Sequence, residues 1–160
     1  MAGVYVLWLA TGTLDFHFHR LTDLPHTSGR RESLLHGVQL LVVGNGVVAW
    51  LSVTPTAALV AVLVLAAMAH AIAGYMDTVS ADGRRRISPA EQHVHSILDV
   101  APWLFVAWVA WRASPEWSVP WDPAPAAAWG WVLVPALLLV VAPWAEEMRR
   151  CLHVGPRRRE

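Results

Sequence analysis

The chain of 160 residues contains no lysine and only one cysteine, Cys151, so all twelve basic residues are arginines. A single cysteine excludes an intramolecular disulfide framework and any metal site built from several cysteines. Flavin- and nucleotide-binding motifs are also missing from the sequence. Any metal chemistry of this chain must therefore use imidazole and carboxylate groups, and electrons for a redox reaction must come from a separate donor.

Charged residues are scarce and unevenly distributed. Only 15% of the residues are charged and 56% are hydrophobic, whereas soluble domains carry about 25% charged residues. No charged residue occurs between Val38 and Met76, or between Ala126 and Ala145. Because a helix needs about 20 predominantly apolar residues to cross a bilayer, these stretches predict an integral membrane protein of the all-α class.

Five apolar segments are predicted to be transmembrane helices within a single domain that covers residues 1–148. The segments are about 2–19, 34–53, 56–76, 90–111 and 126–146, and a basic cytoplasmic tail is expected at 149–160. The 54–56 turn is so short that the second and third helices must be antiparallel neighbours. The N-terminus lacks the positive region of a cleavable signal peptide, so the first segment is expected to be a retained helix.

The distribution of arginines predicts the orientation in the membrane. Connections 20–33 and 78–89 hold three arginines each and the segment after 148 holds five, whereas 54–56 has no charge and 113–125 has only Glu116 and Asp122. Under the positive-inside rule, the arginine-rich segments are cytoplasmic. This arrangement places the N-terminus outside and the C-terminus in the cytoplasm, and we expect a bacterial inner membrane as the location.

Histidine and acidic residues are concentrated at the predicted cytoplasmic ends of the first four helices. On each helix a histidine and a carboxylate are four or seven residues apart, so both side chains share one helix face. One further aspartate lies a turn deeper in the fourth helix. The pairs are Asp15 and His19, Glu32 and His36, His70 and Asp77, and Glu91 and His95, and the additional residue is Asp99.

These nine residues are interpreted as metal ligands. Unpaired charges inside a membrane are energetically costly, and a bound divalent cation offsets that cost. One carboxylate and imidazole pair per helix is the ligand pattern of di-metal four-helix bundles. Nitrogen and oxygen ligands without thiolate favour iron, with manganese or zinc as alternatives. The sequence therefore predicts two divalent metal ions at the cytoplasmic side of a bundle formed by the first four helices.

Other interpretations stay open for some of these residues. Ser88 and Glu91, with Pro89 between them, match a capping box, and Glu32 in a first helical turn can complement the helix dipole. Either glutamate can therefore be structural. Loop arginines can also neutralise carboxylates, which would produce an ion-paired network without metal. By contrast, His70 lies deep in an apolar helix, where capping does not account for it.

The layout of these helix ends resembles that of membrane di-iron desaturases and hydroxylases, which also hold histidine and acidic ligands at the cytoplasmic ends of transmembrane helices. The resemblance implies a monooxygenase- or desaturase-like oxidoreductase. Its substrate would be a lipid or other apolar molecule that reaches the site from the bilayer. The H-x-x-H-H box of those enzymes is missing, so no residue is assigned by motif.

Several other functions fit the same residues. They are a zinc-dependent membrane hydrolase, a metal or proton transporter, a haem-binding protein and a non-catalytic assembly subunit. The expected partners are membrane lipids and a separate electron donor, with a homo-oligomer or a larger membrane complex as the assembly. No nucleic-acid partner is expected.

Overall fold

Helices account for most of residues 2–154, the part of the chain that the computed structural model describes, and no β-strand occurs there. The elements are α1 (Ala2–Leu21), the short 3-10 helix η1 (Leu24–His26), α2 (Gly29–Ser52), α3 (Ala57–Ala81), α4 (Pro89–Ala110), α5 (Ala126–Ala136), η2 (Leu137–Val141) and α6 (Ala142–His153). The last three follow one another without a break, and η2 is a π-helical turn. The five predicted segments thus all lie on helices.

Within residues 2–154, four helical segments are long and apolar enough to cross a membrane, namely α2, α3, α4 and the continuous segment from α5 to α6. The all-helical, membrane-like character predicted from the sequence is therefore confirmed. α1 is 20 residues long but does not meet the same measure of hydropathy. Its second half carries Asp15, His17, His19 and Arg20, which lower its mean hydropathy.

The helices pack in a closed ring. α2 packs on α3, α3 on α4, and α4 on α1, while α6 and η2 lie against α2 and α1 and complete the ring. The extensive packing of α2 on α3 confirms that these two are neighbours. The sequence predicted that the first four helices surround the polar site, and the structure shows that α6 packs against α1 and α2 as well.

The capping box predicted at the start of α4 is present. Ser88 Oγ accepts a hydrogen bond from the Glu91 backbone N–H at 3.2 Å, and the Ser88 backbone N–H donates to Glu91 Oε2 at 3.3 Å. These bonds satisfy amide groups that the first helical turn leaves without a partner. They also hold the Glu91 carboxylate at the polar end of the bundle.

Pro143 frees a backbone carbonyl in the last helical segment, and a side chain of α1 bonds to it. Pro143 has no backbone N–H, so the carbonyl of Leu139, four residues earlier, loses its usual helical donor. Thr13 Oγ1 of α1 donates to that carbonyl at 2.7 Å. Gly12, next to it, lets the helices approach, since a Cβ there would lie 3.3 Å from Val140 Cγ2. At this point α1 and η2, which are far apart in the sequence, are joined by one hydrogen bond and by close packing.

At α6 the helix continues beyond the predicted boundary at residue 148. Arg149 and Arg150 are helical, and α6 ends at His153. The rest of the predicted basic tail, 155–160, lies outside the described residues.

Candidate metal centre

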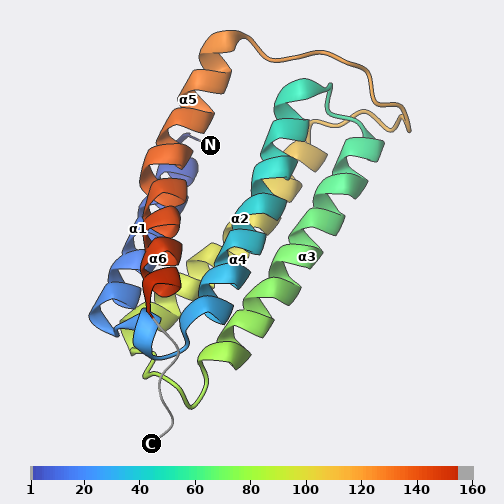
Figure 1. Ribbon diagram of the computed structural model, residues 1–160. Helices are drawn as coiled ribbons and strands as arrows, with labels where there is room; N and C mark the ends of the chain where they lie inside the picture. The colour runs from blue at the N-terminus through green and yellow to red at the C-terminus, as the bar shows by residue number, and fades with distance from the viewer. Residues whose placement is uncertain (1, 155–160) are drawn as a thin grey trace, which may run out of the picture.

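α1, α3 and α6 end, and α2 and α4 begin, at the same end of the bundle (Figure 1). Buried polar side chains converge there. Helix polarity explains this, because alternating up and down helices bring the ends of some to the beginnings of others. We call the following set the polar cluster. It consists of Asp15, His19, Glu32, His36, Asp77, Glu91, His95, Glu147 and the loop residue Arg85.

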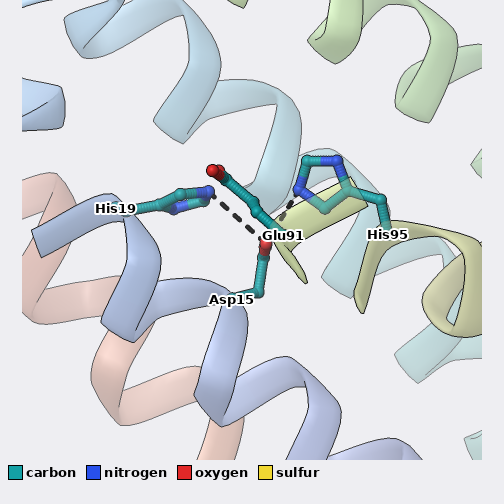
Figure 2. Close-up of side chains that lie close together, drawn as sticks. All are labelled: Asp15, His19, Glu91 and His95. Atoms are coloured by element: carbon teal, nitrogen blue, oxygen red, sulfur yellow. Dashed lines mark hydrogen bonds and ion pairs between the residues drawn. The ribbon is translucent and has the colours of Figure 1, made fainter. Parts of the chain in front are cut away.

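One group of four side chains in this cluster has the spacing of a metal site (Figure 2). Asp15 and His19 come from α1, and Glu91 and His95 from α4, and their ligand atoms all lie within 4.8 Å of one another. Asp15 Oδ1 is 2.8 Å from His95 Nε2 and 3.6 Å from His19 Nε2. Ligand atoms that share a cation at about 2.1 Å are roughly 3–4 Å apart, so modest shifts would suffice to coordinate an ion.

A second group consists of His19, Glu32 and His36. Its atoms also lie within 4.8 Å of one another, and His19 Nε2 is 3.7 Å from Glu32 Oε1. The rings of His19 and His36 stack with centroids 4.6 Å apart and an angle of 16° between their planes. Phe16 packs edge-on against both rings. Because His19 belongs to both groups, the two candidate sites adjoin each other.

The Glu147 carboxylate lies on the Nδ1 side of the two stacked imidazoles and orients them. Glu147 Oε2 is 2.7 Å from His19 Nδ1, and Glu147 Oε1 is 3.3 Å from His36 Nδ1. Metal-binding histidines commonly carry such a carboxylate on the nitrogen that does not bind the metal. Asp77 Oδ2 lies 3.1 Å from His36 Nε2. Glu147 therefore directs the Nε2 atoms of both rings into the cluster.

Glu147 was not among the ligands predicted from the sequence. It follows Glu146 at the very end of the last apolar segment, where neither glutamate has a histidine four residues away. A signal was nevertheless present, because Trp144, Glu147 and Cys151 are spaced to share one face of α6. Glu147 is 2% exposed, while Glu146 is only partly buried and pairs with Arg149.

Arg85 neutralises part of the cluster from the loop between α3 and α4. Its Nε and Nη2 donate to Glu32 Oε1 at 3.0 and 2.6 Å, and its Nη1 donates to Glu91. Burial lowers the pKa of Arg85, but hydrogen bonds and the charges of Glu32 and Glu91 outweigh that effect and raise it above its ordinary value. The guanidinium is thus permanently charged. The sequence interpretation that loop arginines can neutralise carboxylates therefore applies to these two glutamates.

One nitrogen in the cluster is left unsatisfied. Within residues 2–154, His19 Nε2 is buried and has no hydrogen-bond partner. Asp15 Oδ1 and Glu32 Oε1, from two different helices, face it at 3.6 and 3.7 Å, which is too long for a hydrogen bond. An unsatisfied buried polar atom costs about 1–3 kcal/mol. A cation bound by His19 Nε2 would remove that cost.

The charge of the cluster also favours a bound cation. Five buried carboxylates face one guanidinium, which leaves four excess negative charges when the three imidazoles are neutral. Two divalent ions would neutralise that excess, whereas without metal the imidazoles must be protonated to reduce it. The carboxylates are Asp15, Glu32, Asp77, Glu91 and Glu147.

Six of the nine predicted ligands belong to the two candidate groups, and Asp77 adjoins them through His36. The other two, His70 and Asp99, belong to neither group. Asp99 is exposed, and its Oδ1 lies 3.2 Å from the position a Cβ on Gly74 would take. His70 is 6% exposed and lines a cavity beside the cluster. Both therefore lie next to the candidate sites and outside them.

That cavity has a volume of about 160 Å³ and is bounded mainly by α1, α2, α5 and η2. Asp15, His36, Gln39 and His70 form its polar end, and apolar side chains form the rest. It thus connects the polar cluster to an apolar space inside the bundle.

No protein-family model, curated protein or solved structure matches this chain. The function must therefore be argued from the chemistry of the site itself.

Proposed function

We propose that this chain is a membrane metalloprotein whose polar cluster binds two divalent metal ions, iron in preference to manganese or zinc, and that it oxidises an apolar substrate. The observation that carries the proposal is the buried, unpartnered His19 Nε2 between carboxylates of two helices. A cation there explains both the orphan nitrogen and the excess of negative charge.

Five membrane crossings are part of the proposal. α1 has 20 residues, about 30 Å of helix, which matches the thickness of a bilayer core. It packs along α4 and η2, which belong to segments apolar enough to cross. The N-terminus would then be outside and the C-terminus cytoplasmic, with the arginine-bearing loops and the polar cluster on the cytoplasmic side.

The two ions would use different ligands. An imidazole nitrogen has a single lone pair and binds one cation, so His19 Nε2 serves only one of them. The first ion would take Asp15, His19, Glu91 and His95, and the second would take Glu32, His36 and Asp77. Arg85 would remain near Glu32 and Glu91 and contribute the one positive charge that the metals do not supply.

An oxidoreductase fits best because the ligands are nitrogen and oxygen, which suit iron and manganese, and because an apolar cavity adjoins them. Electrons would come from a separate donor, since the chain has no flavin or nucleotide motif. A substrate would reach the cavity laterally from the membrane lipids.

Elemental analysis of the detergent-purified protein tests this proposal. About two iron or manganese ions per chain are expected, and His19→Ala should lose at least one of them. His17→Ala is the matched control, because His17 lies on the same helix two residues away and is exposed. Protein without stoichiometric metal would overturn the metal site, and zinc alone would overturn the redox part in favour of a hydrolase.

A further inference from the structure

Beside the polar cluster, the cavity is long and narrow. Along α1 its wall runs from Phe16 to Tyr5, and along α2 from His36 to Val47. Each of these stretches rises about 16 Å at 1.5 Å per residue. The volume of about 160 Å³ is close to the ~150 Å³ of a cavity that holds one benzene. Spread over that length, the space suits the end of a slender chain better than a ring.

The wall on the α5 side is thin. Val132, Leu133 and Ala136 form it, and no residue of α5 is buried. α5 continues into η2 and has little contact with α2. A membrane lipid chain could therefore pass between α2 and α5 into the cavity without crossing a polar surface.

Two polar side chains at the cluster end of the cavity are free to recognise a ligand. Within the described part of the chain, the side chains of His70 and Gln39 form no hydrogen bond, although both line the cavity. By contrast, Asp15 and His36, which also line it, are bonded to His95 and to Asp77. An imidazole and an amide supply both donors and acceptors, so they match a hydroxyl or a carbonyl group.

The charge around this end decides which polar group fits. Asp15 lines the cavity, and Asp99 Oδ1 lies near Gly74 of α3 together with Gln39 Oε1. The proposed metal ions would neutralise Asp15, but the Asp99 carboxylate belongs to neither candidate group and would repel an anionic headgroup in a site of low dielectric constant. An uncharged end is therefore favoured over a carboxylate or a phosphate.

We infer that the cavity binds one unbranched aliphatic chain with an uncharged polar end, a fatty alcohol or aldehyde, whose oxygen hydrogen-bonds to His70 and Gln39. The inference rests on the proposed function and supplies its substrate class. The carbon atoms next to that oxygen then lie beside Asp15 and His36, at the edge of the candidate metal sites.

Gly44 offers a way to close the cavity without disturbing the bundle. It lines the cavity, and a Cβ built on it meets no atom within 4 Å. A phenylalanine at this position would extend into the space that the chain needs. Gly130 of α5 is a matched control, because it is also helical, exposed and without contacts to a Cβ, but it does not line the cavity.

The test uses a photoreactive analogue of hexadecanol that carries a diazirine in its chain, added to the purified full-length protein. After irradiation, labelled peptides from the cavity walls of α1 and α2 are expected, and excess hexadecanol should compete with this labelling more effectively than hexadecanoate. Gly44→Phe should reduce the competed labelling roughly tenfold, whereas Gly130→Phe should leave it unchanged. Equal helix content and elution volume of the two variants would establish that both are folded.

Labelling that hexadecanol does not displace, or that persists in Gly44→Phe, would overturn the inference. Stronger competition by hexadecanoate would overturn the assignment of an uncharged end. Metal content is measured on the same samples, so that the proposed metal-dependent function and the chain-binding cavity are tested independently. Competed labelling in protein without metal would overturn the proposed function and leave the chain-binding cavity, whereas metal without competed labelling would do the reverse.

Discussion

His19 and His36 stack at 4.6 Å between ring centroids, and the Nδ1 atoms of both face one carboxylate, that of Glu147. The two rings come from α1 and α2, and Glu147 comes from α6. One acidic side chain therefore sets the orientation of two candidate ligands on different helices. This relationship leads to the first prediction.

Glu147→Gln should weaken metal binding by roughly 10–100-fold, the range found when a carboxylate behind a metal-binding histidine is changed. Glutamine keeps the size of the side chain but loses the charge that supports both imidazoles. Metal affinity is measured by competition with a chelator of known strength. Glu146→Gln is the control, because Glu146 lies outside the polar cluster and its side chain bonds to Arg149. Equal affinities of the two variants would show that Glu147 has no role in the site.

Arg85→Gln should destabilise the metal-free protein more than the metal-bound protein. Removing the guanidinium leaves Glu32 and Glu91 buried without a counter-charge, and breaking a buried ion pair in this way costs about 3–5 kcal/mol. Metal ions supply replacement charge, so their addition should recover part of the loss. Thermal unfolding with added metal and with chelator measures the difference.

Arg84→Gln provides the comparison for that experiment, since Arg84 is exposed in the same loop. It should unfold like the unaltered protein under both conditions. A loss in Arg85→Gln that is the same with and without metal would contradict a shared role of the guanidinium and the metals.

Gly37→Ala should destabilise the bundle, although glycine to alanine in a helix normally adds about 0.5–1 kcal/mol of stability. A Cβ on Gly37 would lie 2.6 Å from Trp144 Cζ2, so the indole must move. Trp144 also donates from Nε1 to the Ser33 carbonyl at 2.9 Å and anchors α6 one turn before Glu147. Metal affinity should therefore fall together with stability.

Gly44→Ala on the same helix is the control for Gly37→Ala, because no atom lies within 4 Å of the added methyl group. Its unfolding temperature should stay equal or rise. If Gly37→Ala behaves in the same way, α2 and α6 do not pack as closely as described.

Thr13→Val should destabilise the protein by about 0.5–1.5 kcal/mol, the net contribution of a typical intramolecular hydrogen bond. Thr13 Oγ1 donates to the Leu139 carbonyl that Pro143 leaves free. Thr78→Val is the control, since Thr78 Oγ1 bonds only to the carbonyl of Gly74 in its own helix. Chemical unfolding in detergent compares the two. A smaller loss for Thr13→Val than for Thr78→Val would exclude the proposed role of this bond.

The sequence by itself determined the helices and the residues available for chemistry. Charge-free stretches such as 38–76 predicted membrane-like helices because a bilayer excludes unpaired charge. The capping box at Ser88 was predictable because its two hydrogen bonds join residues three apart. The pairing of Asp15 with His19 on one helix face followed from helical spacing in the same way. These features depend on local geometry, which the order of residues specifies.

Only the tertiary structure decided which of those residues meet. Glu147 lies 128 positions from His19 in the chain, yet its carboxylate is 2.7 Å from that imidazole. Arg85 similarly unites Glu32 of α2 with Glu91 of α4. His70 belongs to the cavity and not to either candidate group because its position on α3 is about two turns from Asp77. Such contacts depend on how the helices rotate and pack against one another, and helical periodicity within one segment does not specify that.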